Sequence, residues 1–201
     1  FRQSDLSITH SSSFVFRKSY FCFGRRIVCV GSNINNNRSW RNTITTLFQV
    51  TLPETSSAVT VDGSAKTGFP FAQTLSKTSA HWLRDTYSTG YYVLAGNTIQ
   101  VEKKSQTSPD QSGNGVTTTA NYTNAYIDHD VAPKDGKYAY VVIPKTTDAA
   151  MAQFASNMSS PSTREFDILQ QDASAHIIRE NATGVPGYSL FEVNTNLTGN
   201  D

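Results

Sequence analysis

Hydrophobic and polar positions alternate along most of this chain in short runs that are separated by turn-forming residues. Runs rich in Val, Ile, Phe, Tyr and Thr are typical of strands, and the Gly, Asn, Asp and Pro between them favour turns. The pattern predicts strands over residues 13–23, 26–32, 43–52, 58–61, 81–83, 90–94, 97–103, 117–128, 137–144, 166–171, 176–179 and 188–193. Residues 105–115 hold Pro109, Gly113 and Gly115 among polar neighbours, which predicts an exposed loop.

Residues 147–158 depart from this pattern and predict one short helix. Thr147 stands where a side chain caps the first turn, and Asp148 follows with a charge that favours a helix start. Ala150, Met151, Phe154 and Met158 recur at helical spacing and are expected to share one buried face.

Many short strands with a single helix predict an all-β (mainly) fold, an antiparallel β-sandwich or barrel, and not a nucleotide-binding α/β fold. At 201 residues the chain is long enough to bury one core, so we expect one domain or the larger part of one. The start at Phe1 predicts a processed product or an excised fragment without an export signal. No apolar run is long enough to span a membrane.

Charge is spread unevenly along the chain. The formal net charge is +1, yet residues 1–50 hold seven Lys or Arg against one acid, a balance of +6 that leaves −5 for the remainder. A basic stretch attracts polyanions such as nucleic acid or a sulfated glycan. The alternative is that these cations are the solvated tips and edges of strands.

The two cysteines, Cys22 and Cys29, are too few for a disulfide scaffold, and their spacing does not suggest a zinc site. They flank the turn Gly24-Arg25-Arg26. A two-residue turn at Arg25-Arg26 would make them face each other, whereas a three-residue turn would put them on opposite faces. We expect buried free thiols, because cysteine packs as a small apolar residue.

Common enzyme motifs are absent: there is no P-loop, no GxGxxG after a strand, no GxSxG and no HExxH. Asp128-His129-Asp130, with Asp135 further on, resembles a cluster of metal ligands. It lacks the glycine and distal glutamate of a calcium loop, and a strand end followed by a polar turn explains it. We therefore expect no metal and no cofactor.

The four histidines are scattered along the chain: His10, His81, His129 and His176. A catalytic histidine needs a nucleophile or carboxylate within hydrogen-bond reach. The apolar neighbours of His81 and His176 favour structural positions in or beside strands, so no catalytic residue is assigned.

A candidate for ligand binding lies in the basic first quarter, where Arg38, Trp40 and Arg41 stand together in an Asn-rich segment. An exposed ring could stack on a sugar face, and the guanidiniums could pair with sulfate or carboxylate groups. The alternative is that Trp40 anchors this loop on the sandwich.

Several segments occur in a fixed order: SSSFVFRKSYF (11–21), RIVCVGSNI (26–34), TTLFQ (45–49), HWLRD (81–85), GYYVL (90–94), YIDH (126–129), PKD (133–135) and YAY (138–140). This series resembles the stretch of polysaccharide lyase family 8, of the chondroitin ABC lyase type, that follows the catalytic helical domain. The pair GSNI and TTLFQ and the run IDH, PKD and YxY are the most specific parts. The resemblance extends from about Ser11 to Phe191.

The resemblance implies that residues 1–201 are part of a single sandwich domain, of the supersandwich, galactose-mutarotase-like type, in a larger multidomain lyase. The family cleaves its substrate by β-elimination at a uronic acid, with tyrosine as acid/base and neighbouring His, Arg and Glu. Those residues lie upstream of the stretch matched here. The segment alone is thus expected to be inactive although the parent is an enzyme.

Three functions are compatible with these observations. The first is a structural and substrate-contacting domain of a secreted or periplasmic bacterial lyase acting on chondroitin or dermatan sulfate or hyaluronan. Its expected partners are that anionic polysaccharide and the rest of the parent chain, with no nucleic acid and no membrane span. The second is a free-standing carbohydrate-binding module, and the third is a surface adhesin. The order of the segments favours the first.

Overall fold

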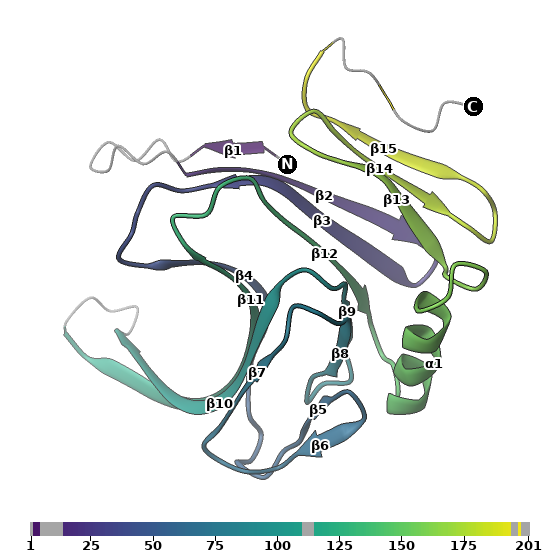
Figure 1. Cartoon of the computed structure of the whole chain (residues 1–201). Coiled ribbons are helices and arrows are strands. Elements are labelled where there is room, and N and C mark those ends of the chain that lie inside the picture. Colours follow the sequence, from purple (N-terminus) through teal and green to yellow (C-terminus); the bar gives the residue numbers. More distant parts are fainter. Residues whose placement is uncertain (1, 5–13, 110–114, 194–196, 198–201) are drawn as a thin grey trace.

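The computed structural model describes residues 2–4, 14–109, 115–193 and 197 (Figure 1). Its elements are β1 (Arg2–Ser4), β2 (Val15–Phe23), β3 (Arg26–Asn35), β4 (Asn42–Thr51), β5 (Val59–Val61), β6 (Ser64–Lys66), β7 (Phe71–Leu75), β8 (His81–Arg84), β9 (Gly90–Val93), β10 (Thr98–Pro109), β11 (Thr117–Val131), β12 (Gly136–Ile143), α1 (Asp148–Met158), β13 (Phe166–Gln171), β14 (Ala175–Glu180) and β15 (Pro186–Leu190). In the described part of the chain, no helix is long and apolar enough to cross a membrane.

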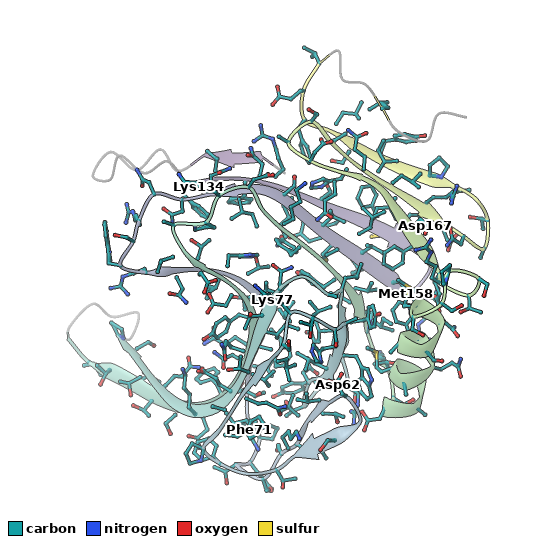
Figure 2. The ribbon with its side chains drawn as sticks, viewed as in Figure 1. Asp62, Phe71, Lys77, Lys134, Met158 and Asp167 are labelled. Carbon is teal, nitrogen blue, oxygen red and sulfur yellow. The ribbon has the colours of Figure 1, made fainter. Side chains whose placement is uncertain are left out.

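The strands form three antiparallel sheets arranged in layers. An eight-stranded sheet in the order β1-β2-β3-β12-β9-β8-β5-β6 lies in the middle. The four-stranded sheet β4-β11-β10-β7 covers one of its faces, and the helix α1 with the three-stranded sheet β13-β14-β15 covers the other. Side chains fill the space between the layers (Figure 2). The prediction of a mainly β, antiparallel sandwich is confirmed; the covering layer behind the central sheet is an addition to it.

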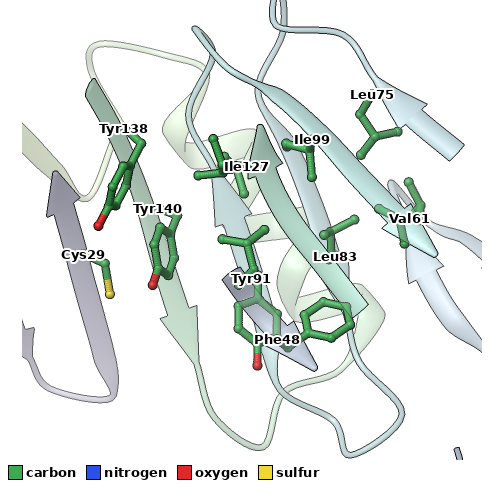
Figure 3. Close-up of a cluster of buried hydrophobic side chains, with 14 of the residues drawn as sticks. Cys29, Phe48, Val61, Leu75, Leu83, Tyr91, Ile99, Ile127, Tyr138 and Tyr140 are labelled. Atoms are coloured by element: carbon green, nitrogen blue, oxygen red, sulfur yellow. The ribbon is translucent and has the colours of Figure 1, made fainter. Parts of the chain in front are cut away.

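The first core lies between the four-stranded sheet and the central sheet (Figure 3). The ring of Phe48 on β4 packs on that of Tyr91 on β9, with centroids 4.9 Å apart. Tyr138 and Tyr140 on β12 stack at 5.8 Å beside the buried Cys29 on β3. Complete burial of each large apolar side chain stabilises the fold by about 1.5–3 kcal/mol, so this core holds the two sheets together.

The second core lies on the opposite face of the central sheet. Met151 and Phe154 of α1 are buried there, and the Phe154 ring meets Tyr92 of β9 edge-on at 5.4 Å. Phe166 on β13 and Ile178 on β14 extend this core under the three-stranded sheet. Strands in the middle sheet are therefore buried on both faces, as the unbroken burial of all four residues of β9 shows.

The helix begins as predicted. The Thr147 side chain accepts a hydrogen bond from the Ala150 amide at 3.2 Å, and Asp148 forms a two-pronged ion pair with Arg84 of β8. That guanidinium lowers the pKa of Asp148. Ala150 was expected on the buried face and is exposed; its position on the first turn leaves Met151 and Phe154 to face the sheet.

The predicted loop over residues 105–115 is wrong for residues 105–109, which continue β10 against β11. Side-chain hydrogen bonds join the strands there: the Thr107 and Thr119 hydroxyls lie 2.6 Å apart, and the Ser105 hydroxyl donates to the amide oxygen of Asn121 at 2.5 Å. A backbone ladder needs no apolar side chains, so polar composition alone did not reveal this strand. Residues 110–114 lie outside the described part.

Cys22 and Cys29 are both free thiols, but only Cys29 is buried. The hairpin turn consists of Gly24 and Arg25, because Phe23 pairs with Arg26. Cys22 and Cys29 thus share one face of the sheet, which along β2 is half-buried at Phe16 and Lys18 and exposed at Tyr20 and Cys22. Burial raises the pKa of the Cys29 thiol to about 11.

Candidate functional site

The segment that holds the predicted ligand-binding residues connects β3 to β4 and is fixed by polar contacts. The Asn36 side chain accepts from the Arg38 amide at 3.1 Å and donates to the Thr43 hydroxyl at 3.1 Å. The Asn36 amide donates to the Pro133 carbonyl, and the Ala132 amide donates to the Arg38 carbonyl, each at 3.1 Å. The loop is therefore held against the β11–β12 turn without help from an aromatic anchor.

Trp40 projects from this loop with 69% of its surface exposed. The Arg38 guanidinium carbon lies 5.6 Å from the centre of the Trp40 ring, a cation–π arrangement. Arg41 is exposed, and neither arginine forms an ion pair with a described residue. The alternative that Trp40 anchors the loop does not fit this exposure. The loop presents one ring with the Arg38 guanidinium over it and a second exposed cation, Arg41, next in sequence, a combination that suits an anionic sugar.

The last residues of β11, just before the turn that supports this loop, contain the sequence Asp128-His129-Asp130. Both carboxylate oxygens of Asp128 accept from the Asn42 side chain, at 2.9 and 2.8 Å, and one also accepts from the Asp130 amide. His129 hydrogen-bonds the Thr45 hydroxyl at 2.9 Å, and burial lowers its pKa. Within the described ranges, no three His, Cys, Asp or Glu side chains are grouped to hold a metal ion. These residues shape the end of β11 and its contact with the loop.

His81 and His176 both form structural contacts, and His10 lies outside the described residues. His81 on β8 pairs with Asp62 at 2.7 Å and with the Ser76 carbonyl at 3.0 Å. Asp62 in turn accepts from the Trp82 amide at 2.8 Å, which closes the turn after β5.

His176 on β14 is completely buried between two serines of the central sheet. The Ser32 hydroxyl donates to the Asp172 carbonyl at 2.6 Å, so it accepts from His176 Nε2 at 2.8 Å. The other ring nitrogen, Nδ1, then accepts from the Ser19 hydroxyl at 2.8 Å. Burial lowers the pKa of His176 to about 4, which keeps the imidazole neutral near pH 7 and leaves Nδ1 as this acceptor.

Comparison with known proteins decides the family. The super-sandwich domain of polysaccharide lyase family 8 matches residues 2–155. The chain belongs to this family. The family 8 resemblance inferred from the segments is thereby confirmed.

Relatives of this family 8 chain include the chondroitin sulfate ABC endolyase of Proteus vulgaris, 28% identical over 180 residues, which are 90% of this chain and 17% of that protein. The chondroitin sulfate ABC exolyase of Bacteroides thetaiotaomicron is 29% identical over 90% of this chain and 16% of its own length. A Paenibacillus xanthan lyase structure matches with a TM-score of 0.77 and 24% identity over 94% of this chain and 19% of that one, which supports the fold. The chain spans about a sixth of the length of these curated relatives.

A second group of cations in this family 8 domain escaped the sequence reasoning. Arg25 in the β2–β3 turn and Arg26, the first residue of β3, line a pocket beside α1 together with Lys145, which follows β12. The adjacent arginines were visible in the sequence as a turn. Nothing in the spacing indicated that Lys145, about 120 residues later, lies beside them.

Proposed function

We propose that the chain is the β-sandwich domain of a larger, secreted or periplasmic bacterial lyase that degrades glycosaminoglycans by β-elimination. Chondroitin or dermatan sulfate, or hyaluronan, is the proposed substrate class. Membership of polysaccharide lyase family 8 carries this proposal. The names of the Proteus vulgaris and Bacteroides thetaiotaomicron relatives support chondroitin sulfate in particular.

Within that enzyme, this chain contributes support and polymer contact, and the chemistry takes place elsewhere. β-Elimination needs a base at the uronate C5 proton and groups that stabilise the resulting carbanion. The family resemblance assigns both to regions upstream of this stretch. Arg38 and Arg41 then pair with carboxylate or sulfate groups while a sugar face lies on the Trp40 ring. The exposed Trp40 would serve a free-standing carbohydrate-binding module equally well.

Two measurements on the purified 201-residue chain test this proposal. The ultraviolet absorbance of unsaturated uronate should not rise when the chain is incubated with chondroitin sulfate; clear turnover would show that the active site lies within it. Binding of chondroitin sulfate should be detectable in low salt and should weaken as salt rises, because exposed charges are screened over roughly 8 Å at physiological ionic strength.

The loop itself is tested by the triple variant R38A/W40A/R41A. A matched control is K77A/R179A/Y188A, which removes two exposed cations and one exposed ring from other parts of the surface. The loop variant should bind chondroitin sulfate more weakly than the control, with unchanged circular dichroism in both. Equal binding by the two variants would remove the loop from the contact surface.

A further inference from the structure

The pocket beside α1 carries an excess of positive charge. Its lining includes Arg25, Arg26 and Lys145 but a single carboxylate, that of Glu165. Glu165 pairs with Arg26 at 2.5 Å, which leaves Arg25 and Lys145 without an ion-pair partner among the described residues. Both of these cations are exposed. By contrast, the pocket next to Asp128 at the end of β11 is lined by equal numbers of lysines and aspartates and has no such excess.

The pocket also has an apolar wall. Ile143, Pro144 and Phe154 line it, and the Arg26 guanidinium lies 5.6 Å from the centre of the Phe154 ring. Gln153 and Asn157 supply amide groups from the helix. A volume of about 580 Å³ is within the range of pockets that hold small ligands. An apolar wall, a cationic rim and nearby amides together fit a sugar ring that carries anionic groups.

We infer that this pocket is a second binding site for an anionic polysaccharide, in which Arg25 and Lys145 pair with carboxylate or sulfate groups of one sugar unit. The inference rests on the substrate class of the proposed function and adds a site to it. Arg26 is paired with Glu165, so its charge is partly neutralised and it attracts an anionic ligand less strongly than Arg25 and Lys145 do. Lys145 has a left-handed backbone with φ of 51°, which a lysine adopts only where its surroundings hold it there.

The two sites lie at opposite ends of β3, since Arg25 precedes this strand and Arg38 follows it. Ten residues at roughly 3.3 Å each separate them by about 30 Å. A long polymer can therefore occupy both sites at once, and the second contact adds to the affinity without a second diffusional encounter. A short oligosaccharide can occupy only one site at a time.

The test uses the 201-residue chain, a chondroitin sulfate polymer and a chondroitin sulfate tetrasaccharide. R25Q/K145Q should bind the polymer roughly three- to tenfold more weakly than the unmodified chain, as expected for the loss of two exposed ion pairs. K66Q/R179Q removes the same number and kinds of cations elsewhere and should bind like the unmodified chain. In NMR titrations, the tetrasaccharide should shift the amide signals of Arg25 and Lys145. Their shifts should follow a binding curve of their own, different from the curve of the Arg38 and Arg41 signals.

The outcomes separate this inference from the proposed function. Equal polymer binding by R25Q/K145Q and K66Q/R179Q, or amide signals at Arg25 and Lys145 that do not respond to the tetrasaccharide, would overturn the second site and leave the loop untouched. If R25Q/K145Q binds the polymer more weakly while R38A/W40A/R41A binds like the unmodified chain, the pocket is established as a binding site and the loop is excluded from the contact surface.

Discussion

Lowering the pH from 7 to 5 should weaken the fold mainly through one buried side chain, His176. This imidazole is completely buried, and its pKa falls from an ordinary value of 6.5 to about 4. Desolvation is the main cause; the neighbouring charges of Arg17 and Lys137 act in the same direction, and Asp172 opposes them. The unfolded chain therefore binds a proton in this window that the folded chain does not.

The direction and the size of this change in the free energy of unfolding follow from the two pKa values of His176. The stability that depends on the neutral imidazole is fully present above pH 6.5 and is lost as the pH falls towards 4. At 1.36 kcal/mol per pKa unit, the full loss is about 3 kcal/mol, and the part between pH 7 and 5 is about 2 kcal/mol. For a chain of this length, that corresponds to a fall in Tm of roughly 4 to 8 °C.

Urea unfolding across pH 4 to 7 measures this effect in the unmodified chain and in His176→Gln. Glutamine can keep a donor towards Ser32 but loses the packing of the ring and its bond with Ser19, so this variant should be less stable than the unmodified chain at pH 7. Because glutamine does not titrate, the free energy of unfolding of the variant should not fall with pH through this position. The two curves should converge near pH 4. His129→Gln is the matched control, because His129 also has a lowered pKa but should leave most of the slope intact. Parallel curves for the unmodified chain and His176→Gln would refute the reasoning.

Three further predictions concern packing, capping and thiol chemistry. Gly31→Ala should lower the free energy of unfolding, measured by urea titration, by about 1–3 kcal/mol because a Cβ there would overlap the ring of Tyr138 on β12. Gly68→Ala, whose Cβ meets open space, should be nearly neutral in the same titration. Thr147→Ala should cost about 1 kcal/mol through loss of the helix cap, measured by thermal unfolding. A thiol reagent at pH 8 should modify Cys22 rapidly and Cys29 only on unfolding, and reductant should leave Tm unchanged; equal rates would contradict the burial of Cys29.

The period-two pattern and the turn residues predicted most strands, since an amphipathic strand marks its own buried face. The polar continuation of β10 escaped because its pairing with β11 depends on the backbone ladder and not on apolar side chains. Cys22 was expected to be buried, but the sequence could not show which face of β2 would be covered. The strands β13, β14 and β15 were predicted, but their place as a separate layer was not, because the contacts that fix it join residues more than 100 positions apart, such as Ser19 and His176.

Arg38, Trp40 and Arg41 were predicted together as candidate binding residues, because they are neighbours in sequence and their combined chemistry is visible without the fold. Its exposure was left open by the sequence, since tryptophan is on average a buried residue. The cationic pocket was not predicted at all. Arg25 and Lys145 belong to turns at the ends of different strands, and only the pairing of β3 with β12 brings those turns together.

Burial of the central sheet on both faces has a consequence for how this domain tolerates change over evolution. On β10, buried and partly exposed positions alternate from Thr98 to Lys103, so every second residue faces solvent and is free to vary. On β9, all four residues are buried, so a substitution at any of them disturbs the packing of a core. A saturation mutagenesis experiment should therefore show tolerance with a period of two along β10 and uniform intolerance along β9. Sequence drift in this domain is then expected to concentrate at the solvent-facing positions of its outer sheets, while the middle sheet varies little at any position.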